Sequence, residues 1–284
     1  MTDKIIALVD GSTYSQSVCE HAAWVAERTG WAVELLHILG RREGAGKADY
    51  SGSIALGART ALLEELAELD AQRARLVIHR GRAILEDARA ILDRAGINEI
   101  TTRLRHGDIV DTVAEQEGEA EMVLIGKRGE AADFARGHLG SNLERIVRAS
   151  RKPVFVVARA FKPITRVLVA YDGGASAMRA VEHVARTPLY RGLEVSVVTV
   201  GSASDAVRKS LADAKAALET AGIAVETDIV AGQPETALAE LVEEAPFDMV
   251  VMGAYGHSRI RSMIIGSTTT EMIRSCKVPI VLTR

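Results

Sequence analysis

Short continuous apolar runs alternate with amphipathic stretches throughout residues 164–284. The apolar runs predict five strands, at Arg166–Ala170, Glu194–Val200, Val225–Val230, Met249–Met252 and Val278–Leu282. Between them, apolar residues recur at helical spacing and predict helices at Ser176–Arg186, Ala203–Ala221, Pro234–Glu244 and Thr268–Ser275. Strands that are apolar on both faces and alternate with helices are typical of a parallel sheet covered on both sides. The pattern therefore predicts a doubly wound α/β domain.

Four blocks of sequence occur twice in the chain, in the same order. The matching pairs are KIIALVDG (4–11) and RVLVAYDG (166–173), 91–115 and 217–240, EMVLIGKRG (121–129) and DMVVMGAYG (248–256), and 143–157 and 270–283. Because repeats of this kind indicate repeated structural units, we predict two tandem domains, 1–160 and 164–284. Each is expected to hold a doubly wound parallel five-stranded sheet with strand order 3-2-1-4-5.

The first predicted domain contains an additional stretch, at about residues 41–80, that has no counterpart in the second. Within it, Ile54–Gly81 is rich in Ala, Leu, Glu and Arg, and its apolar residues recur at helical spacing. We therefore expect a lengthened helix in the first domain.

The stretch after the fourth strand of the second domain has the pattern of a phosphate-binding loop. It reads Gly-x2-Gly-x9-Gly-Ser-Thr and is formed by Gly253, Gly256, Gly266, Ser267 and Thr268. Glycines let the backbone approach a polyphosphate closely, and the unpaired N–H groups at a helix start favour phosphate. Ligands of such sheets bind beyond the carboxyl ends of the strands, where the strand order reverses. Asp172 follows the first strand at that place and is expected to accept hydrogen bonds from the adenine or ribose end of a nucleotide.

Each of these features also has an ordinary structural explanation. Glycine often follows a buried strand, Gly-Ser-Thr is a common helix start, and Asp172 alone could be a turn residue. The combination, in this order and on this alternation of strands and helices, favours a nucleotide site.

Over nearly its whole length, in both repeats, the chain resembles tandem members of the universal stress protein family. ATP-binding members of that family have a G-x2-G-x9-G-[ST] loop after the fourth strand and an aspartate after the first. The resemblance implies a fold of the adenine-nucleotide α-hydrolase type. It also implies that Asp172 contacts the adenine end, that the backbone of Val200 lines the adenine pocket, and that the glycines hold ribose and phosphates. The implied ligand is ATP, or ADP or AMP. Because the loop alone offers little cationic charge, we expect Mg²⁺ to accompany the phosphates.

The first domain departs from this pattern. Its candidate residues at the equivalent positions are Asp10, Ile38, Gly126, Gly129, Gly140 and Ser141. Ten residues rather than nine separate the second and third glycines, and Asn142 replaces the second hydroxyl residue. One additional residue can be absorbed as a bulge in a loop, so nucleotide binding here stays open. Lys127 and Arg128 also stand in this loop; they could meet phosphate, but exposed basic side chains usually meet solvent.

Composition and charge argue against several classes of protein. The 284 residues carry a net charge of −3, whereas a nucleic-acid-binding protein usually presents a basic face. No apolar run reaches the roughly 18 residues of a membrane span, and the opening MTDKIIALVDGS does not have the pattern of a signal peptide. Cys19 and Cys276 fall in helical patterns and are expected to be reduced core thiols. We expect a cytoplasmic protein that binds neither nucleic acid nor membranes.

The candidate chemistry favours binding over rapid turnover. The sequence has neither the Gly-Lys-Ser/Thr ending of a Walker loop nor a Gly-x-Ser-x-Gly elbow, and its histidines and cysteines form no short-spaced metal-ligand set. We therefore expect a nucleotide that acts as a regulatory or structural ligand and is hydrolysed slowly at most. Two alternatives stay open: a stress-response scaffold whose sites are empty, and an enzyme that adenylates a substrate, for which we find no pyrophosphate signature.

The resemblance also implies how the two domains associate, because family dimers pair their last strands edge to edge. Here Pro153–Val157 and Pro279–Thr283 are expected to pair within one chain, which satisfies two sheet edges at once. Pro279, at the start of the last strand, suits such an edge. This predicts an internal pseudo-dimer and leaves a further homodimer open.

Overall fold

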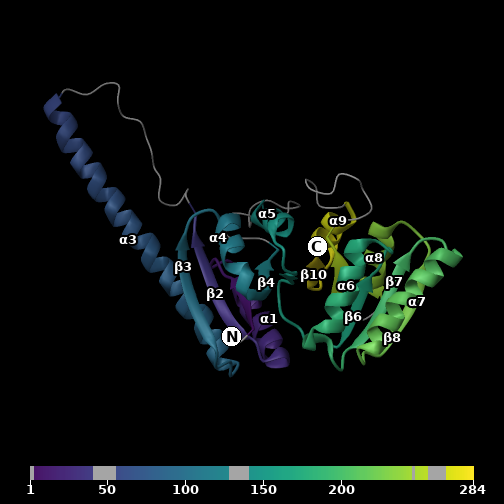
Figure 1. The fold of residues 1–284 in the computed structure, drawn as a ribbon. Helices are drawn as coiled ribbons and strands as arrows, with labels where there is room; N and C mark the ends of the chain where they lie inside the picture. The colour runs from purple at the N-terminus through teal and green to yellow at the C-terminus, as the bar shows by residue number, and fades with distance from the viewer. Residues whose placement is uncertain (1–2, 41–55, 128–140, 245–246, 255–266) are drawn as a thin grey trace.

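The computed structural model of the chain describes residues 3–40, 56–127, 141–244, 247–254 and 267–284 (Figure 1). Four glycines of the two candidate loops lie outside these ranges: Gly129, Gly140, Gly256 and Gly266. Residues 41–55, which precede the lengthened helix, also lie outside the described ranges.

The same alternation of strands and helices runs through both halves. The first half contains β1 (Lys4–Leu8), α1 (Ser15–Thr29), β2 (Ala32–Leu39), α3 (Leu56–Arg94), β3 (Ile100–His106), α4 (Ile109–Gln116), the 3₁₀ turn η1 (Glu117–Glu119), β4 (Ala120–Gly126), α5 (Ser141–Ala149) and β5 (Val154–Val157). The second contains β6 (Arg166–Ala170), α6 (Ala175–Arg186), the 3₁₀ turn η3 (Pro188–Tyr190), β7 (Glu194–Val200), α7 (Asp205–Thr220), β8 (Val225–Val230), α8 (Pro234–Glu244), β9 (Met249–Gly253), α9 (Ser267–Ser275) and β10 (Ile280–Thr283). The predicted elements of the second half are all present, and their bounds differ from the prediction by at most two residues.

The strands form one ten-stranded sheet with the order β3-β2-β1-β4-β5-β10-β9-β6-β7-β8. The predicted order 3-2-1-4-5 is therefore confirmed in each half. Neighbouring described strands are parallel except at the centre, where β5 and β10 pair antiparallel, with Phe155 opposite Val281. The expected pairing of the last strands is present, and it joins the two five-stranded sheets into one.

Pro279 was expected to suit an edge strand, and β10 is the last strand of the second half's own five-stranded sheet. β10 begins one residue later and has a partner on each side, β5 and β9. The proline precedes the ladder, so its missing N–H removes no strand hydrogen bond. Its carbonyl accepts a hydrogen bond from the backbone N–H of Val250 at 3.0 Å.

Helices cover both faces of the sheet. Residues of α1, α3, α6 and α7 share one core with strand residues such as Ile5 and Val167. Residues of α4, α5, α8 and α9 share a second core with Ile6 and Leu168. Successive side chains of a strand point to opposite faces, which explains why the strands are apolar at nearly every position, as the sequence predicted.

The lengthened helix of the first half is longer than predicted. α3 has 39 residues, whereas its counterpart α7 has 16, because the inserted segment continues without a break into the domain's own second helix. The helix does not end at Gly81. A Cβ at that position would lie 2.8 Å from Leu104 Cδ1 and 3.0 Å from His37 Cδ2, so the glycine allows the helix to pack closely on β3 and β2.

Candidate functional site

Five residues of the predicted nucleotide site are described, and the sheet brings their elements together. Strand order reverses between β6 and β9, so the carboxyl ends of these two strands form the expected crevice. Ala170 at the end of β6 is in register with Val198 of β7 and Met252 of β9. Asp172, Val200 and Gly253 therefore follow at the same edge, and Ser267 and Thr268 begin α9. Gly256 and Gly266 lie outside the described residues.

Asp172 orders the turn between β6 and α6. Its exposed carboxylate accepts a hydrogen bond from the N–H of Gly174 at 2.8 Å through Oδ1, and Gly173 between them has a φ of 76°. Asp10 does the same after β1, where its Oδ1 accepts from the N–H of Ser12 at 3.0 Å and from Ser15 Oγ at 3.3 Å. The structural explanation left open for Asp172, a turn residue, is thus present in both halves.

Gly253 has a packing role that the sequence did not reveal. A Cβ on this glycine would lie 2.6 Å from Ser176 Oγ and 2.8 Å from Ser176 Cβ and backbone carbon. Ser176 is buried in the first turn of α6, so a side chain at position 253 would push α6 away from β9. The absence of a Cβ here is explained by close contact between helix and strand rather than by approach to a ligand.

Thr269 fixes the start of α9 to the end of β9. Its hydroxyl is buried and lies 3.3 Å from the carbonyl oxygens of both Gly253 and Ala254. Sequence reasoning missed this residue, because a third hydroxyl residue in Ser267-Thr268-Thr269 carries no distinguishing signal. The contact sets the position of the α9 N-terminus relative to the sheet edge.

The hydroxyls of Ser267 and Thr268, in the predicted phosphate-binding loop, meet a carboxylate of the same chain. Ser267 Oγ and Thr268 Oγ1 each donate to Oε1 of Glu235 at 3.0 Å, and Glu235 lies in the first turn of α8. Its own backbone N–H and the hydroxyls of Thr268 and Ser267 hold the pKa of Glu235 below its usual range. The start of α9 therefore holds an ionised carboxylate, which the sequence did not predict because an acidic residue in a first helical turn is common.

Lys127, in the loop after β4, was expected to meet solvent, and the structure contradicts this expectation. It is buried, and its ammonium donates to the carbonyl oxygen of Cys276, at the end of α9 in the other half. Burial lowers the pKa of Lys127. Ala254 occupies the equivalent position in the second half and is also buried. Lys127 thus interacts with the negative end of a helix across the junction of the halves and is removed from the candidates for phosphate binding.

The other candidates of the first half have the arrangement of the second. Asp10 follows β1, Ile38 lies near the end of β2, Gly126 ends β4, and Ser141 begins α5. Gly129 and Gly140 lie outside the described residues. The described backbone of the first half therefore provides the same edge at the same reversal of strand order.

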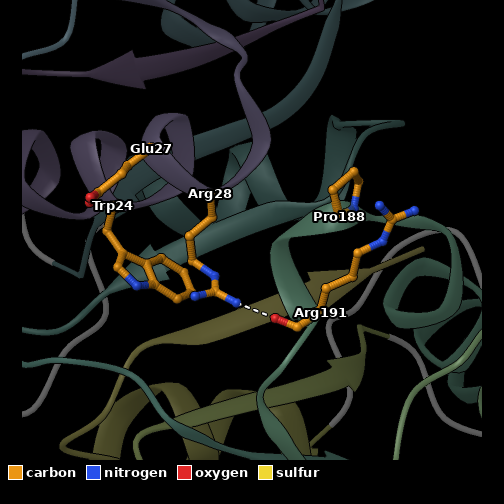
Figure 2. A pocket seen from close by; sticks show the side chains of 5 residues that line it. All are labelled: Trp24, Glu27, Arg28, Pro188 and Arg191. Atoms are coloured by element: carbon orange, nitrogen blue, oxygen red, sulfur yellow. Dashed lines mark hydrogen bonds between the residues drawn. The ribbon is translucent and has the colours of Figure 1, made fainter.

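A second concave site lies between α1 and η3, at the junction of the halves (Figure 2). It is an open hollow of about 440 Å³, lined by Trp24, Glu27, Arg28, Pro188 and Arg191. Arg28 Nε donates to the carbonyl of Leu189 at 2.8 Å, Nη2 donates to the carbonyl of Arg191, and the guanidinium lies 5.6 Å from the Trp24 ring centre. These residues precede β2 and β7, so the pocket lies toward the amino ends of the strands, away from the nucleotide candidates. Through these two hydrogen bonds, Arg28 of the first half is bound to backbone carbonyls of the second half.

Among the described residues, no three His, Cys, Asp or Glu side chains gather as a metal site would require. Within the same ranges, no helix combines the length and the apolar character needed to cross a membrane.

Comparison with known proteins matches each half of the chain to the same family. The model of the universal stress protein family matches residues 1–158 and again residues 163–284. A universal stress protein of Synechocystis sp. is 35% identical over 284 residues, which cover 99% of each chain. One from Mycobacterium tuberculosis is 27% identical over 194 residues, which cover 62% of this chain and 65% of the relative. The solved structure of a universal stress protein from Archaeoglobus fulgidus has the same fold, with a TM-score of 0.75, 22% identity, and coverage of 100% of this chain and 99% of that one.

Proposed function

Because the chain belongs to the universal stress protein family, we propose that its second half binds an adenine nucleotide as a regulatory or structural ligand. The observation that supports this most directly is the carboxylate of Glu235, which accepts hydrogen bonds from Ser267 and Thr268. A carboxylate and a phosphate oxygen are both anionic acceptors. The start of α9, at the reversal of strand order, therefore has the donors that a phosphate group requires.

The proposal assigns a role to each end of the nucleotide. Asp172 is exposed at the end of β6, where it would accept hydrogen bonds from the adenine or ribose. The backbone at Val200 would line the adenine pocket, and the backbone from Gly253 onward would follow the ribose and phosphates. Asp172 would repel phosphate at short range, whereas the start of α9 presents the positive end of a helix and two hydroxyls, although Glu235 holds these hydroxyls without a ligand. The polarity of the site thus orients the ligand.

Glu235 must release the two hydroxyls when phosphate binds. The phosphates are anionic at neutral pH. The carboxylate of Glu235 is anionic as well, because its pKa is held below its usual range. Like charges at hydrogen-bond distance repel strongly unless a cation lies between them. Mg²⁺ bound to the phosphates would reduce this repulsion. We propose that Glu235 competes with the phosphates and weakens the affinity for a triphosphate.

The same site suits retention of the nucleotide better than rapid hydrolysis. The loop ends in Gly266-Ser267-Thr268, without the lysine that a Walker loop places on the outer phosphates. Any turnover is expected to be slow.

The first experiment is to denature purified protein and identify the nucleotide that it releases. Thermal unfolding of the full chain is then followed with MgATP, MgADP and AMP. A ligand present at a thousand times its Kd stabilises the folded state by about 4 kcal/mol. No stabilisation by any of them at millimolar concentration would overturn the proposal and favour a scaffold with empty sites. Two observations fit a scaffold as well: packing explains Gly253, and the same Glu235 contact satisfies the hydroxyls without a ligand.

Variants locate the site. Gly266→Val is expected to abolish nucleotide stabilisation, and Gly140→Val, at the equivalent position of the first half, should leave the second site intact. Glu235→Gln should strengthen ATP binding several-fold, whereas Glu240→Gln, an exposed change on the same helix, should not. Unchanged affinity in Gly266→Val would refute the assignment of the loop, and unchanged affinity in Glu235→Gln would refute the competition.

A further inference from the structure

Helix α3 extends beyond the domain that carries it. Among residues 62–94 of this helix, whose burial the structure describes, the buried ones are Gly81, Leu85, Ala88 and Leu92, which pack against the rest of the first half. From residue 62 to residue 80, no side chain of the helix is buried. Figure 1 shows this part of α3 running past the edge strand β3 and away from the sheet. About 20 residues of helix thus project from the body of the protein.

The projecting part of α3 carries an apolar stripe. Leu62, Leu66, Leu69 and Leu76 recur at intervals of four, three and seven residues, which places them on one face of a helix. Leu69 and Leu76 are 55% and 70% exposed, and Leu63 beside them is 50% exposed. These are the large apolar side chains that the described residues leave most open to solvent. A helix of this length gains most of its stability in proteins by packing such a face.

The charges along the same segment are separated by sign. Residues 62–70 contain four acids and no base, namely Glu64, Glu65, Glu68 and Asp70. Residues 71–82 contain four arginines and no acid, namely Arg73, Arg75, Arg80 and Arg82. Ion pairs along one helix join residues three or four positions apart, and of the four acids only Asp70 has an arginine at such a distance. Pairing within the helix therefore does not explain the charge pattern.

We propose that α3 pairs with α3 of a second copy of this chain, in an antiparallel two-helix interface centred near Ala71. In a parallel pair, acids would lie beside acids and arginines beside arginines. In an antiparallel pair, the acidic part of each helix lies along the basic part of the other. With Ala71 at the centre, Leu66 lies opposite Leu76 of the partner subunit, and Asp70 lies near Arg73 of the partner subunit.

The length of the segment and the topology of the sheet agree with this arrangement. Residues 62–82 span about 30 Å of helix at 1.5 Å per residue, which is three heptads of a coiled coil. The last strands β5 and β10 already pair with each other inside the chain. A second copy therefore cannot add to either of them, and a dimer must use another surface. The projecting α3 provides one that needs no rearrangement of the sheet.

The first test measures the molar mass of the full chain by light scattering during gel filtration, at micromolar concentration. We expect twice the chain mass of 30.4 kDa. A Leu69→Gln, Leu76→Gln variant should weaken the dimer by at least about tenfold in Kd. The matched control is Ala67→Gln, Ala74→Gln, on the face away from the stripe. Both residue pairs are exposed, so circular dichroism and the Tm should show an intact fold in each variant.

A second test determines the orientation of the helices by disulfide cross-linking. Leu66→Cys mixed with Leu76→Cys should give a cross-linked dimer, and either variant alone should not. The native thiols of Cys19 and Cys276 are buried and should not interfere. A monomeric wild-type chain would overturn the proposal. A dimer that survives the double leucine change, or cross-linking of either single variant alone, would overturn it too.

Discussion

Two histidines whose ring Nε2 atoms are buried, His21 and His183, should make the protein lose stability as the pH falls from 7 to 5. His21 in α1 and His183 in α6 occupy equivalent positions, each after a glutamate, in the two halves. His21 Nδ1 lies 2.7 Å from the carbonyl oxygen of Ser17, so this nitrogen carries the proton. Nε2 finds no hydrogen-bond partner among the described residues, and the ring lies edge-on to Phe155 and Phe161. Protonating Nε2 would place a charge in this apolar surrounding.

His183 is in a similar situation. Its Nδ1 lies 3.2 Å from Thr187 Oγ1, its ring lies edge-on to Tyr190, and its Nε2 also finds no partner within the described part of the chain. Burial lowers the pKa of His21 and of His183 to about 4, from 6.5 in an unfolded chain. The folded state therefore binds fewer protons than the unfolded state between these values. Stability is complete above the unfolded pKa and decreases as the pH falls through 6.5 toward 4.

The size of the effect follows from the two pKa values. One pKa unit corresponds to about 1.4 kcal/mol, and at pH 5 the unfolded histidine is almost fully protonated while the folded one is neutral. Each histidine then removes about 2 kcal/mol relative to pH 7, and the pair removes about 4 kcal/mol. Most carboxylates titrate below pH 5, so this interval isolates the histidines.

The assay is urea unfolding of the full chain at pH 7 and pH 5. The measured quantity is the difference between the two pH values, so that any constant destabilisation of a variant cancels. His21→Asn retains a donor near the Ser17 carbonyl and should reduce the difference by about half, and the double variant with His183→Asn should remove most of it. His106→Asn, an exposed change on β3, is the control. A wild-type difference below about 1 kcal/mol, or one that persists in the double variant, would refute the reasoning.

Two shorter predictions concern the site itself. Gly253→Ala should lower the free energy of unfolding by about 1–3 kcal/mol without any nucleotide, because the new Cβ overlaps Ser176. Gly118→Ala, where a Cβ meets nothing within 4 Å, should change it little, and equal stability of both variants in urea unfolding would contradict the packing role. Asp172→Ala should weaken binding of adenine nucleotides in calorimetry more than binding of tripolyphosphate. Equal weakening would mean that Asp172 lies at the phosphate end.

The repeat and the alternation of elements could be predicted because both are patterns along the chain, and the strand order followed from the doubly wound fold class that this alternation indicates. A strand apolar on both faces needs cover on both faces, and this requirement can be seen in a run such as Met249–Met252 without any knowledge of its partners. The same logic placed Asp172, Val200 and Gly253 at one edge of the sheet, since parallel strands end at the same edge. The end of α3 could not be placed, because Gly81 resembles a helix terminus until Leu104 and His37 are seen beside it.

Contacts between residues that are distant in the chain had to come from the folded structure. Glu235 reaches Ser267 across 32 positions, and Lys127 reaches Cys276 across 149. Hydrophobic periodicity indicates which face of an element is buried, but a hydrogen bond depends on how two elements are placed side by side, to within a fraction of an ångström. For this reason the chain's own pattern located the candidate site and its fold, whereas the packing of helices on the shared sheet decided which polar groups meet there.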